Sequence, residues 1–547
     1  MAGSPRKRTA PDKAGRRSTP AEDARKWWGR HARAHRYVVS SAEAPSAGVA
    51  TVLRQEGLVM EVAGRRTWIL VPQPPQDRRA VFLSNYWPVV ENVLTRYNPS
   101  AVVGLEAVKL HLGDFTAPDI LPVQQGANRS EYLLELEPGF SLRLRPRDIT
   151  GVKAQELEAP GGARIRVLCA ADLLATLDEP EVADGVEPVT AWLRHLVIRT
   201  PDLERATSEW PRPQVLRRLA DVSAAIDNKP LARQLDAAAR RISTRSAPPS
   251  RTGVGSRIII PPAILAQPRA SGSPWLDEQA MRLERQSADI SKLLGSRIAA
   301  LPSFRLQHLI ANAVQSKAYD AYHSTTMEGY RISLDVVDAI VRGDPPQDGP
   351  QDETSLRAAM AVQGYSVAFD SVLVRAKNRS PVTGSLILDL YEDLFRPSVD
   401  AGIVEPGELR GWRTSSVSLK GWRHVPPNAR KIRDLIDGLE TFAAESEIDP
   451  VTRAFLVHLE FVTIHPFLDG NGRLGRLLMN LELLSGGLPW VTVRADERNA
   501  FFRAIESAQV DNDTEPFIRY LWHLLRQSIH DMENSVKQKR GGARRRK

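Results

Sequence analysis

The sequence predicts a protein of two parts, an α+β N-terminal region and a mostly α-helical C-terminal domain. Apolar residues recur at helical spacing from about residue 274 to about residue 533. Residues 131–150 alternate apolar and polar side chains like a pair of strands. Between the two parts, residues 243–256 are rich in Ser, Pro, Gly and Arg, which is typical of a linker.

The 547 residues divide further by composition and pattern. At roughly 100–200 residues per domain, this length suggests about three folding units. We expect a basic disordered tail over 1–26, an α+β domain over 27–200, a helical connector over 201–242, a linker over 243–275, a helical domain over 276–535 and a basic tail over 536–547.

The net charge of +9 is concentrated at the two ends of the chain. Residues 1–36 hold eleven Lys or Arg against three acids, and residues 537–547 hold seven Lys or Arg and no acid. Such tails attract nucleic-acid phosphates. The simpler interpretation, a solvated and disordered tail, is equally open.

Cysteine usage and hydropathy bear on the compartment. Cys169 is the only cysteine, so no disulfide can form within the chain. No apolar run approaches the ~20 residues that a membrane helix needs, and no apolar stretch of a secretory signal follows the basic N-terminus. The sequence therefore predicts a soluble, cytoplasmic protein without a membrane partner.

A short helix and a hairpin open the N-terminal region. Residues 48–57 are predicted to be helical, and residues 58–62 and 67–71 are predicted strands joined by an Ala-Gly-Arg-Arg turn. A helix followed by a basic-tipped hairpin is typical of a winged helix. Possible DNA contacts are then Arg54, Arg65 and Arg66.

Two short segments carry a weak family resemblance in this region. Leu53–Leu58 before the hairpin and Val103–Ala107 at a helix start resemble winged-helix antitoxin regulators of the abortive-infection type. The alternative is a domain for substrate docking or dimerisation. Further along we expect a helical stretch over 80–113 with a loop around Asn98-Pro99, a strand followed by a helix over 163–178, and a helix pair over 212–242 broken near Asn228.

The chemistry is concentrated in residues 465–476, which read His-Pro-Phe-Leu-Asp-Gly-Asn-Gly-Arg-Leu-Gly-Arg. Pro466 predicts that the preceding apolar helix ends near His465. A second helix is predicted to begin after Gly472. The glycines let backbone N–H groups approach a ligand closely, and the start of a helix favours anions. This loop therefore predicts a phosphate site.

Charged side chains surround the predicted phosphate site. Arg473 and Arg476 are three residues apart and share one helix face. Asp469 offers the carboxylate oxygen that Mg²⁺ prefers beside phosphate oxygens. His465 stands just before the loop, where it can accept a proton from an attacking hydroxyl. A chance match to all nine fixed positions is of order 10⁻¹² per starting point.

This segment is similar to the Fic family signature, His-x-Phe-x-Asp/Glu-Gly-Asn-Gly-Arg-x-x-Arg, at every fixed position. The resemblance implies a helical fold in which His465 is the base for a target Ser, Thr or Tyr hydroxyl that attacks the α-phosphate of ATP. Asp469 would hold Mg²⁺ on the phosphates. The residues that would bind the nucleotide phosphates are Gly470, Asn471, Gly472, Arg473 and Arg476.

The glycine at position 472 bears on which group is transferred from the donor nucleotide. Fic-related kinases of the Doc type carry Lys where this chain has Gly472, so the resemblance favours transfer of AMP over transfer of phosphate. UTP, GTP or a choline-bearing nucleotide remain alternative donors.

An upstream segment, residues 324–329, reads Ser-Thr-Thr-Met-Glu-Gly within a predicted helix. Alone it would be an ordinary helix end with a solvated acid. It resembles the family's inhibitory pattern, Ser/Thr-x-x-x-Glu-Gly/Asn. The resemblance implies that Glu328 pairs with Arg476 and occupies the cation meant for the γ-phosphate, while Ser324 helps to hold the inhibitory helix.

Residues 410–427 resemble the Fic flap, a β-hairpin that aligns the target segment by strand addition. Val417, Ser418 and Leu419 would form its docking edge. Residues 498–502 resemble the adenine-side segment of the family, with Phe501 in place of a more usual Tyr. His458, seven residues before His465, is interpreted as a core residue or a support for the site.

Together these features predict an autoinhibited Fic-type transferase that moves AMP from ATP to a protein hydroxyl and releases pyrophosphate, with Mg²⁺ as cofactor. One alternative is the same site using another donor or removing AMP. The other is a DNA-binding regulator whose Fic domain senses nucleotide. The partners expected are a hydroxyl-bearing protein target and, as alternatives, DNA and a second copy of the chain.

Overall fold

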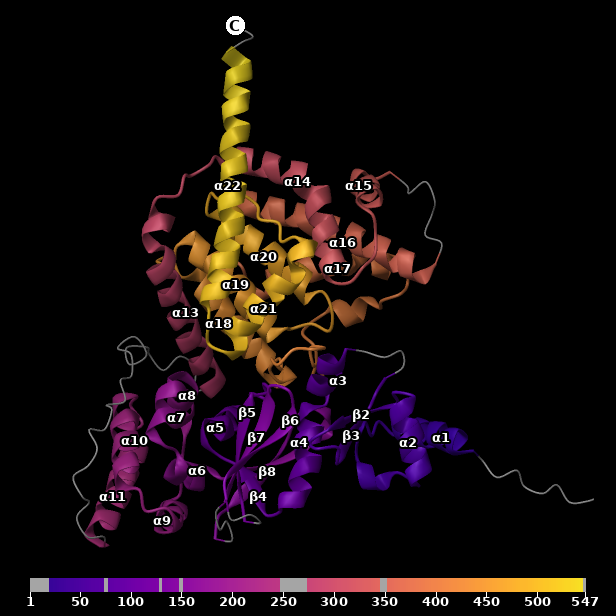
Figure 1. Cartoon of the computed structure of the whole chain (residues 1–547). Coiled ribbons are helices and arrows are strands. Elements are labelled where there is room, and N and C mark those ends of the chain that lie inside the picture. The colour runs from indigo at the N-terminus through magenta and orange to yellow at the C-terminus, as the bar shows by residue number, and fades with distance from the viewer. Residues whose placement is uncertain are drawn as a thin grey trace, which may run out of the picture.

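The computed structural model describes residues 19–72, 77–126, 130–146, 151–245, 273–344 and 352–544. Figure 1 shows a helical body that carries the C-terminal half of the chain, seated on a lower body built from the N-terminal half. The expected boundaries at 200 and 242 fall near the ends of helices, and most of the expected linker lies outside the described residues.

A small unit at one end of the lower body has the predicted helix-and-hairpin order (Figure 1). Its strands pair antiparallel in the order β1-β3-β2, and Trp27, Leu53 and Trp68 fill its core. Its elements are α1 (Pro20–Arg33), β1 (Val38–Ser40), η1 (Ser41–Glu43), α2 (Ala47–Gln55), β2 (Val59–Val62) and β3 (Thr67–Leu70).

The expected disordered tail over 1–26 is too long. Helix α1 already begins at Pro20, because Thr19 and Glu22 form a capping box that satisfies the first backbone N–H groups. The opposite tail also differs, since the last helix continues to Arg544. The remaining tail positions, 1–18 and 545–547, lie outside the described residues.

A six-stranded mixed sheet in the order β6-β7-β5-β4-β9-β8 forms the centre of the lower body. The predicted pair over 131–150 is present as β6 and β7. The expected helical stretch over 80–113 is broken around Asn98-Pro99 as predicted, but the break also contains the unpredicted strand β4, because a short, fully buried central strand shows little alternation. The strands are β4 (Ser100–Val102), β5 (Ile120–Gln125), β6 (Tyr132–Glu137), β7 (Phe140–Pro146), β8 (Ala154–Glu158) and β9 (Arg164–Leu168).

Helices pack around this sheet and continue from it. The predicted break near Asn228 is confirmed, since α10 ends at Ala225 and α11 begins at Lys229. The Asn228 side chain accepts from the Leu231 N–H in the first turn of α11 and donates to the carbonyls of Leu193 and Leu196. The helices are α3 (Arg78–Ser84), α4 (Tyr86–Leu94), α5 (Gly104–Leu112), α6 (Ala170–Thr176), α7 (Glu179–Asp184), α8 (Val186–His195), α9 (Thr200–Glu209), α10 (Pro213–Ala225) and α11 (Lys229–Arg245).

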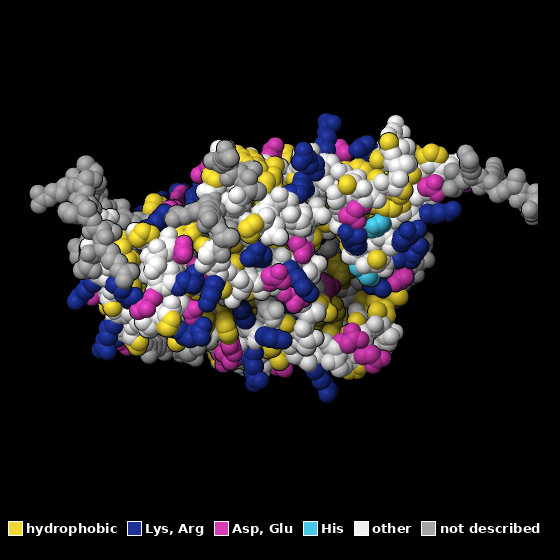
Figure 2. All heavy atoms as spheres, turned by 90° about the horizontal axis from the view of Figure 1, so that it is seen from below, with side chains coloured by type: hydrophobic (Ala, Val, Ile, Leu, Met, Phe, Trp, Pro, Cys, Tyr) yellow, Lys and Arg dark blue, Asp and Glu magenta, His cyan; other side chains and the backbone are white. Residues whose placement is uncertain are grey.

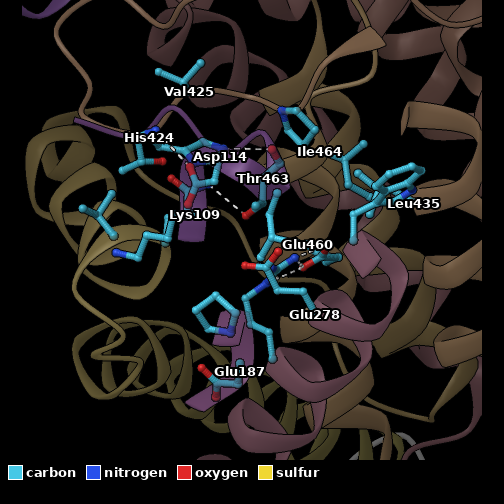
Figure 3. Close-up of a pocket in the computed structure, with 18 of the residues that line it drawn as sticks. Lys109, Asp114, Glu187, Glu278, His424, Val425, Leu435, Glu460, Thr463 and Ile464 are labelled. Atoms are coloured by element: carbon cyan, nitrogen blue, oxygen red, sulfur yellow. Dashed lines mark hydrogen bonds and ion pairs between the residues drawn. The ribbon is translucent and has the colours of Figure 1, made fainter. Parts of the chain in front are cut away.

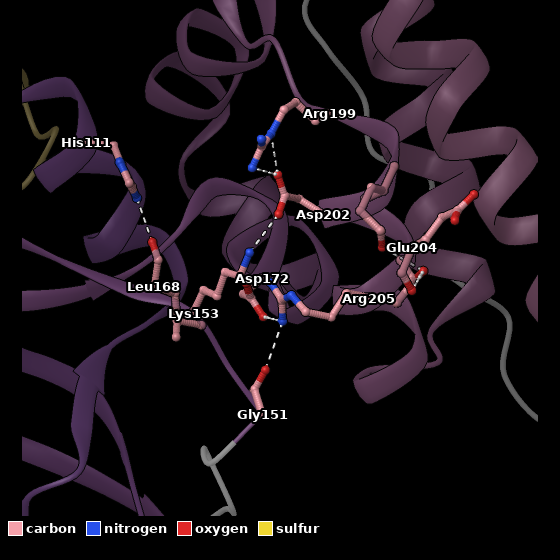
Figure 4. Close-up of polar contacts among 11 residues, drawn as sticks. His111, Gly151, Lys153, Leu168, Asp172, Arg199, Asp202, Glu204 and Arg205 are labelled. Atoms are coloured by element: carbon pink, nitrogen blue, oxygen red, sulfur yellow. Dashed lines mark hydrogen bonds and ion pairs between the residues drawn. The ribbon is translucent and has the colours of Figure 1, made fainter.

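Ion pairs fasten α9 to the strands and helices beside it (Figure 4). Arg205 binds the fully buried carboxylate of Asp172 on α6 and donates to the carbonyl of Gly151. Asp202, one turn earlier, accepts from Lys153 and Arg199. Because a buried carboxylate without a partner is costly, we expect removal of Arg205 alone to destabilise the fold by leaving Asp172 unpaired.

The upper body is helical, as predicted. Helices α19 and α20 lie at its centre, and nearly every residue of both is buried. Its helices are α13 (Pro274–Ala299), α14 (Leu306–Met327), α15 (Leu334–Arg342), α16 (Glu353–Asn378), α17 (Gly384–Asp400), α18 (Ile432–Ala444), α19 (Pro450–Ile464), α20 (Asn471–Ser485), α21 (Arg498–Val510) and α22 (Glu515–Arg544). Among the residues described, no helix has the length and apolarity to cross a bilayer.

Polar contacts join the two bodies. Asp277, at the start of α13, accepts from His195 at 2.8 Å and lies 3.1 Å from Arg194, both at the end of α8. Arg285, two turns later on α13, pairs with Glu187 at the start of α8. Helix α13 therefore connects the helical body to the sheet-containing body through its first turns.

Candidate active site

The loop between α19 and α20 adopts the cradle that the sequence predicts. His465 ends α19 in the left-handed region, with φ of 52°, and Gly470 caps α20 with φ of 82°. The Asn471 side chain accepts from the backbone N–H of Phe467 and donates to its carbonyl, both within 3.0 Å. The Asn471 side chain therefore closes the loop.

One ring nitrogen of His465 faces a backbone carbonyl oxygen. Its Nδ1 lies 3.4 Å from the carbonyl oxygen of Val462, so a proton on Nδ1 leaves a lone pair on Nε2. Burial lowers the pKa of His465 to about 4, and the positive charge of Arg413 acts in the same direction. The imidazole is therefore neutral at neutral pH, which is the state that a general base requires.

The two predicted arginines lie in different surroundings. Arg473 is almost fully buried, lies over the rings of Tyr330 and Phe395, and contacts Asp469 at 3.3 Å. Its Nε has no hydrogen-bond partner among the described residues. The Asp469 side chain remains 58% exposed. This pair could receive a charged ligand without breaking a buried network.

Arg476 meets the two upstream residues that the resemblance singled out. Its Nη2 donates to a Glu328 carboxylate oxygen at 2.7 Å and to the Ser324 carbonyl at 2.9 Å, and its Nε donates to the Ser324 hydroxyl at 3.0 Å. Burial alone would raise the pKa of Glu328, but the Arg476 charge outweighs it and holds that pKa below its ordinary value.

The Glu328 carboxylate lies directly over the start of α20. A Cβ added at Gly472 would be 2.3 Å from Glu328 Oε1 and 3.2 Å from Arg476 Nη1. The first turn of a helix has backbone N–H groups without helical partners and a positive dipole end. Glu328 therefore places a negative charge beside these N–H groups.

The segment expected to form a β-hairpin flap contains no strand between residues 411 and 427. Its end residues bond elsewhere, which explains the difference. The Arg413 N–H donates to Pro466, and the Arg423 N–H donates to Glu506. Ser418 is exposed while Val417 and Leu419 are half-buried, so the expected alternation persists in an extended loop.

Arg413 is a site residue that motif reasoning missed. It is 6% exposed, and its guanidinium donates to the carbonyl of His465 at 2.8 Å. A signal was present, since Gly-Trp-Arg occurs twice in the flap segment, at 411–413 and 421–423. A repeated tripeptide does not reveal which backbone carbonyls its arginines reach.

On the expected adenine side, Phe501 is a core residue. It is 1% exposed and stacks on His458 with ring centroids 5.5 Å apart. His458 is itself buried between Phe501 and Phe517, in agreement with its interpretation as a core residue. Phe502 is the partly exposed ring, packed against Trp422 and under Arg498.

Two cavities border these elements. One of about 530 Å³ is lined by Asp469, Arg473 and the first limb of the flap segment. The other, of about 120 Å³, lies between the two bodies (Figure 3). There His424 lies against the Thr463 carbonyl at 2.9 Å, and Glu278 faces Asp114 across the junction.

The candidate DNA contacts lie on the small unit, and some of them already take part in ion pairs with Glu61. Arg54 pairs with Glu61 at 2.7 Å, and its guanidinium lies over the Trp68 ring. Arg65 is 86% exposed and lies 3.9 Å from Glu61, and Arg66 is exposed at the turn. Figure 2 shows basic side chains interspersed with acidic ones over the lower face, without one continuous basic patch.

The residues present fit a magnesium ion that arrives with phosphate. The described residues contain no group of three or more His, Cys, Asp or Glu that could hold a metal alone. Mg²⁺ commonly uses one or two carboxylates together with phosphate oxygens and water. Asp469, exposed beside the helix start, could supply such a carboxylate.

The geometry of this loop and its surroundings is that of a particular class of protein domain. A buried histidine, a glycine-rich loop, a helix start and two buried arginines meet within residues 465–476, and residues 381–483 match the family described as Fic/DOC family. The C-terminal region of this chain contains a Fic domain.

Curated relatives are similar to part of this chain. "Protein adenylyltransferase Fic" of Drosophila willistoni is 27% identical over 256 residues, which cover 44% of this chain and 49% of that protein. "Protein adenylyltransferase fic-1" of Caenorhabditis elegans is 29% identical over 204 residues, which cover 37% of this chain and 38% of that protein. The chain thus spans half or less of the length of these relatives.

Solved structures are also similar. A Fic-domain-containing signaling protein of Bacteroides thetaiotaomicron has a TM-score of 0.37 at 20% identity and covers 46% of this chain and 98% of that one. Fic-1 of Caenorhabditis elegans has a TM-score of 0.37 at 19% identity and covers 65% of this chain and 93% of that one.

Proposed function

We propose that this chain transfers AMP from ATP to a hydroxyl group of a protein. One observation carries the proposal. A neutral, oriented imidazole at position 465 and an anion site at the start of α20 are built into the same short loop. The match to relatives named protein adenylyltransferase supports the same activity.

Each residue then has a defined part in the reaction. The target hydroxyl oxygen forms a bond to the α-phosphorus, the bond from that phosphorus to the bridging oxygen breaks, and pyrophosphate leaves. Nε2 of His465 takes the hydroxyl proton. Backbone N–H groups at Gly472 and the charges of Arg473 and Arg476 hold the phosphate oxygens. Mg²⁺ beside Asp469 would neutralise phosphate charge.

The position of Gly472 supports AMP transfer over phosphate transfer. A side chain there would meet Glu328 and Arg476, as the 2.3 Å and 3.2 Å approaches of an added Cβ show. Because no side chain projects from position 472, the first turn of α20 can admit a triphosphate along it once the Glu328 carboxylate moves away. Other nucleotides that present the same phosphates remain alternative donors.

We also propose that the contact between Glu328 and Arg476 restrains the reaction. The carboxylate already satisfies the cation and covers the helix start that a γ-phosphate would need. Because both groups belong to one chain, the carboxylate competes at high effective concentration. ATP would then bind with its α-phosphate turned away from His465.

The decisive experiment incubates the purified Glu328→Gly protein with α-labelled ATP and Mg²⁺, with and without cell lysate. Labelled protein bands are expected to form much faster than with the wild type. Glu328→Gln, which keeps the size and removes the charge, should also label faster. Adding His465→Ala should reduce labelling by about 10²–10⁴-fold while ATP binding persists.

Arg476→Ala in the Glu328→Gly background tests the reason for the gain. If the freed cation is the benefit, this second change reverses it. A wild type that labels faster than Glu328→Gly would mean that Glu328 serves catalysis, and removal of AMP from a modified protein would become the better interpretation. Absence of label in every variant would reject AMP transfer.

A second function, DNA binding, is favoured by one observation on the small unit. Its hairpin presents Arg65 and Arg66 to solvent next to α2. We expect Arg65→Ala together with Arg66→Ala to weaken DNA binding and to lower its salt slope by about two, one per phosphate contact. Arg54→Ala is a matched comparison, because Glu61 already engages that arginine. Equal binding by all variants would contradict a DNA-binding wing.

A further inference from the structure

The end of α19 receives an unusual set of donors. The carbonyls of Ile464 and His465 accept from the Arg413 guanidinium, and the carbonyl of Pro466 accepts from the Arg413 backbone N–H. The last carbonyls of a helix have no helical partners and form the negative end of its dipole. A buried arginine at this place donates to these carbonyls and places a positive charge at the negative end of the dipole.

His465 needs such support because its backbone is left-handed, with φ of 52°. This conformation is unfavourable for a non-glycine residue, because its Cβ comes close to the following carbonyl oxygen. It also sets the direction in which the imidazole leaves the chain. Donors on the carbonyls on either side of that residue keep the conformation in place.

The same guanidinium reaches the flap segment at two points. Its Nη1 donates to the carbonyl of Ser415 at 2.8 Å, and its Nη2 donates to the carbonyl of Pro427 at 2.6 Å. These positions lie on either side of Val417–Leu419, the predicted docking edge. One side chain thus joins both limbs of the flap segment to the turn that carries the base.

No carboxylate within the described ranges forms an ion pair with Arg413. Burial lowers its pKa to about 10, so it remains charged at neutral pH. A planar fork of donors matches several carbonyls at once, whereas a lysine offers one compact ammonium group. The requirement at position 413 is therefore for the shape of arginine as well as its charge.

We propose that Arg413 is a positioning residue that holds the His465 imidazole and the target-docking flap in one fixed relation. The inference rests on the proposed transfer activity. It adds that a target hydroxyl laid along the flap is delivered to Nε2 because both are fastened to one side chain. Misplacement by about 1 Å in such an arrangement can cost about 10²-fold in rate.

Arg423, from the second Gly-Trp-Arg, supplies a matched comparison. It pairs with Asp119 at 3.1 Å and with Asp511 at 2.8 Å, and its Nε donates to the Ala117 carbonyl. Arg423 therefore joins the flap segment to the sheet-containing body and makes no contact with the His465 turn. The two arginines share a local sequence and differ in what they hold.

The test places Arg413→Lys, Arg413→Gln, Arg423→Lys and Arg423→Gln in the Glu328→Gly background. Labelling at saturating α-labelled ATP gives kcat, and its dependence on ATP gives KM. Melting temperatures show whether each variant folds. We expect both Arg413 variants to lower kcat by about 10–100-fold with KM for ATP changed less than about threefold. The Arg423 variants should stay within about threefold of the parent.

A titration separates positioning from a general structural role. The groups acting on the His465 imidazole are His424, Arg413 and Glu328, and Glu328 is absent from every variant in the series. Arg413→Gln removes a positive charge, so the pKa of His465 should rise and the acid limb of the rate profile should move to higher pH. Arg413→Lys should leave that limb in place while kcat remains low.

Equal losses in the Arg413 and Arg423 variants, or losses that follow only the folded fraction, would overturn the proposal. If the parent labels nothing, the proposed function fails by itself. Titration of the His465 imidazole by NMR then still tests Arg413, because an unchanged imidazole pKa and chemical shift in Arg413→Gln would contradict the positioning role.

Discussion

His465 shows how one residue depends on its surroundings. Its type and place were evident from the sequence, yet a histidine with an ordinary pKa near 6.5 would be partly protonated at pH 6. Burial and the nearby Arg413 charge lower its pKa to about 4. The imidazole is therefore neutral over the whole neutral range, as the proposed role of general base requires.

This shift predicts a pH profile. A depressed histidine pKa means that the neutral form is complete at pH 6 and is lost only as the pH falls toward 4. Labelling by Glu328→Gly should therefore be flat from about pH 8 to about pH 6 and should decline below about pH 5. A decline centred near pH 6.5 would show that His465 titrates as an exposed histidine. Measurements should be confined to pH values at which the protein remains folded.

At the scale of elements, close helix crossings position the loop. Gly364 on α16 packs against the backbone of α17, where an added Cβ would lie 1.9 Å from the Leu394 carbonyl oxygen. The ring of the next residue, Phe395, would lie 2.8 Å from a Cβ added at Gly470. The Arg473 guanidinium lies over the same ring. A shift of α17 would therefore reach the phosphate loop.

We expect Gly364→Ala to destabilise the protein by about 1–3 kcal/mol, because a methyl group must displace backbone rather than a flexible side chain. Chemical denaturation would measure the change in free energy of unfolding. Gly295→Ala on α13 is the matched control. Its added Cβ would meet only Ser291 Oγ, at 3.6 Å, so it should be neutral or stabilising by up to about 1 kcal/mol. Similar losses for both would contradict the crossing argument.

At the scale of the whole molecule, charged side chains are buried at the junction between the two bodies. Glu278 on α13 faces Asp114 of the lower body, with Arg282, Lys431 and Lys109 nearby. Burial raises the pKa of Glu278 to about 7, despite the lowering effect of Arg282. The junction therefore contains a carboxyl group whose charge the fold disfavours.

The sign of the resulting pH dependence follows from that shift. The folded protein keeps the Glu278 proton longer than the unfolded chain, so stability is highest below the ordinary pKa and is lost as the pH rises through about 7. Glu278→Gln cannot ionise, and it should melt at a higher temperature than the wild type at pH 8 but not near pH 5. Glu353→Gln, on an exposed turn of α16, should show no such difference. A gain of equal size at both pH values would contradict a titrating Glu278.

The sequence by itself determined the phosphate loop and the helical character of the C-terminal domain. Both depend on local interactions, namely glycines at a helix start, a proline after a helix end and apolar spacing within one helix. Its resemblance to a family also indicated that Glu328 would meet Arg476. The tertiary structure alone decided that Asn471 closes the loop, that the flap segment forms no hairpin and that Arg413 holds the His465 turn. Those features depend on hydrogen bonds between groups distant in sequence, such as Arg413 and His465, 52 residues apart. The local sequence pattern does not indicate which distant groups will form such bonds.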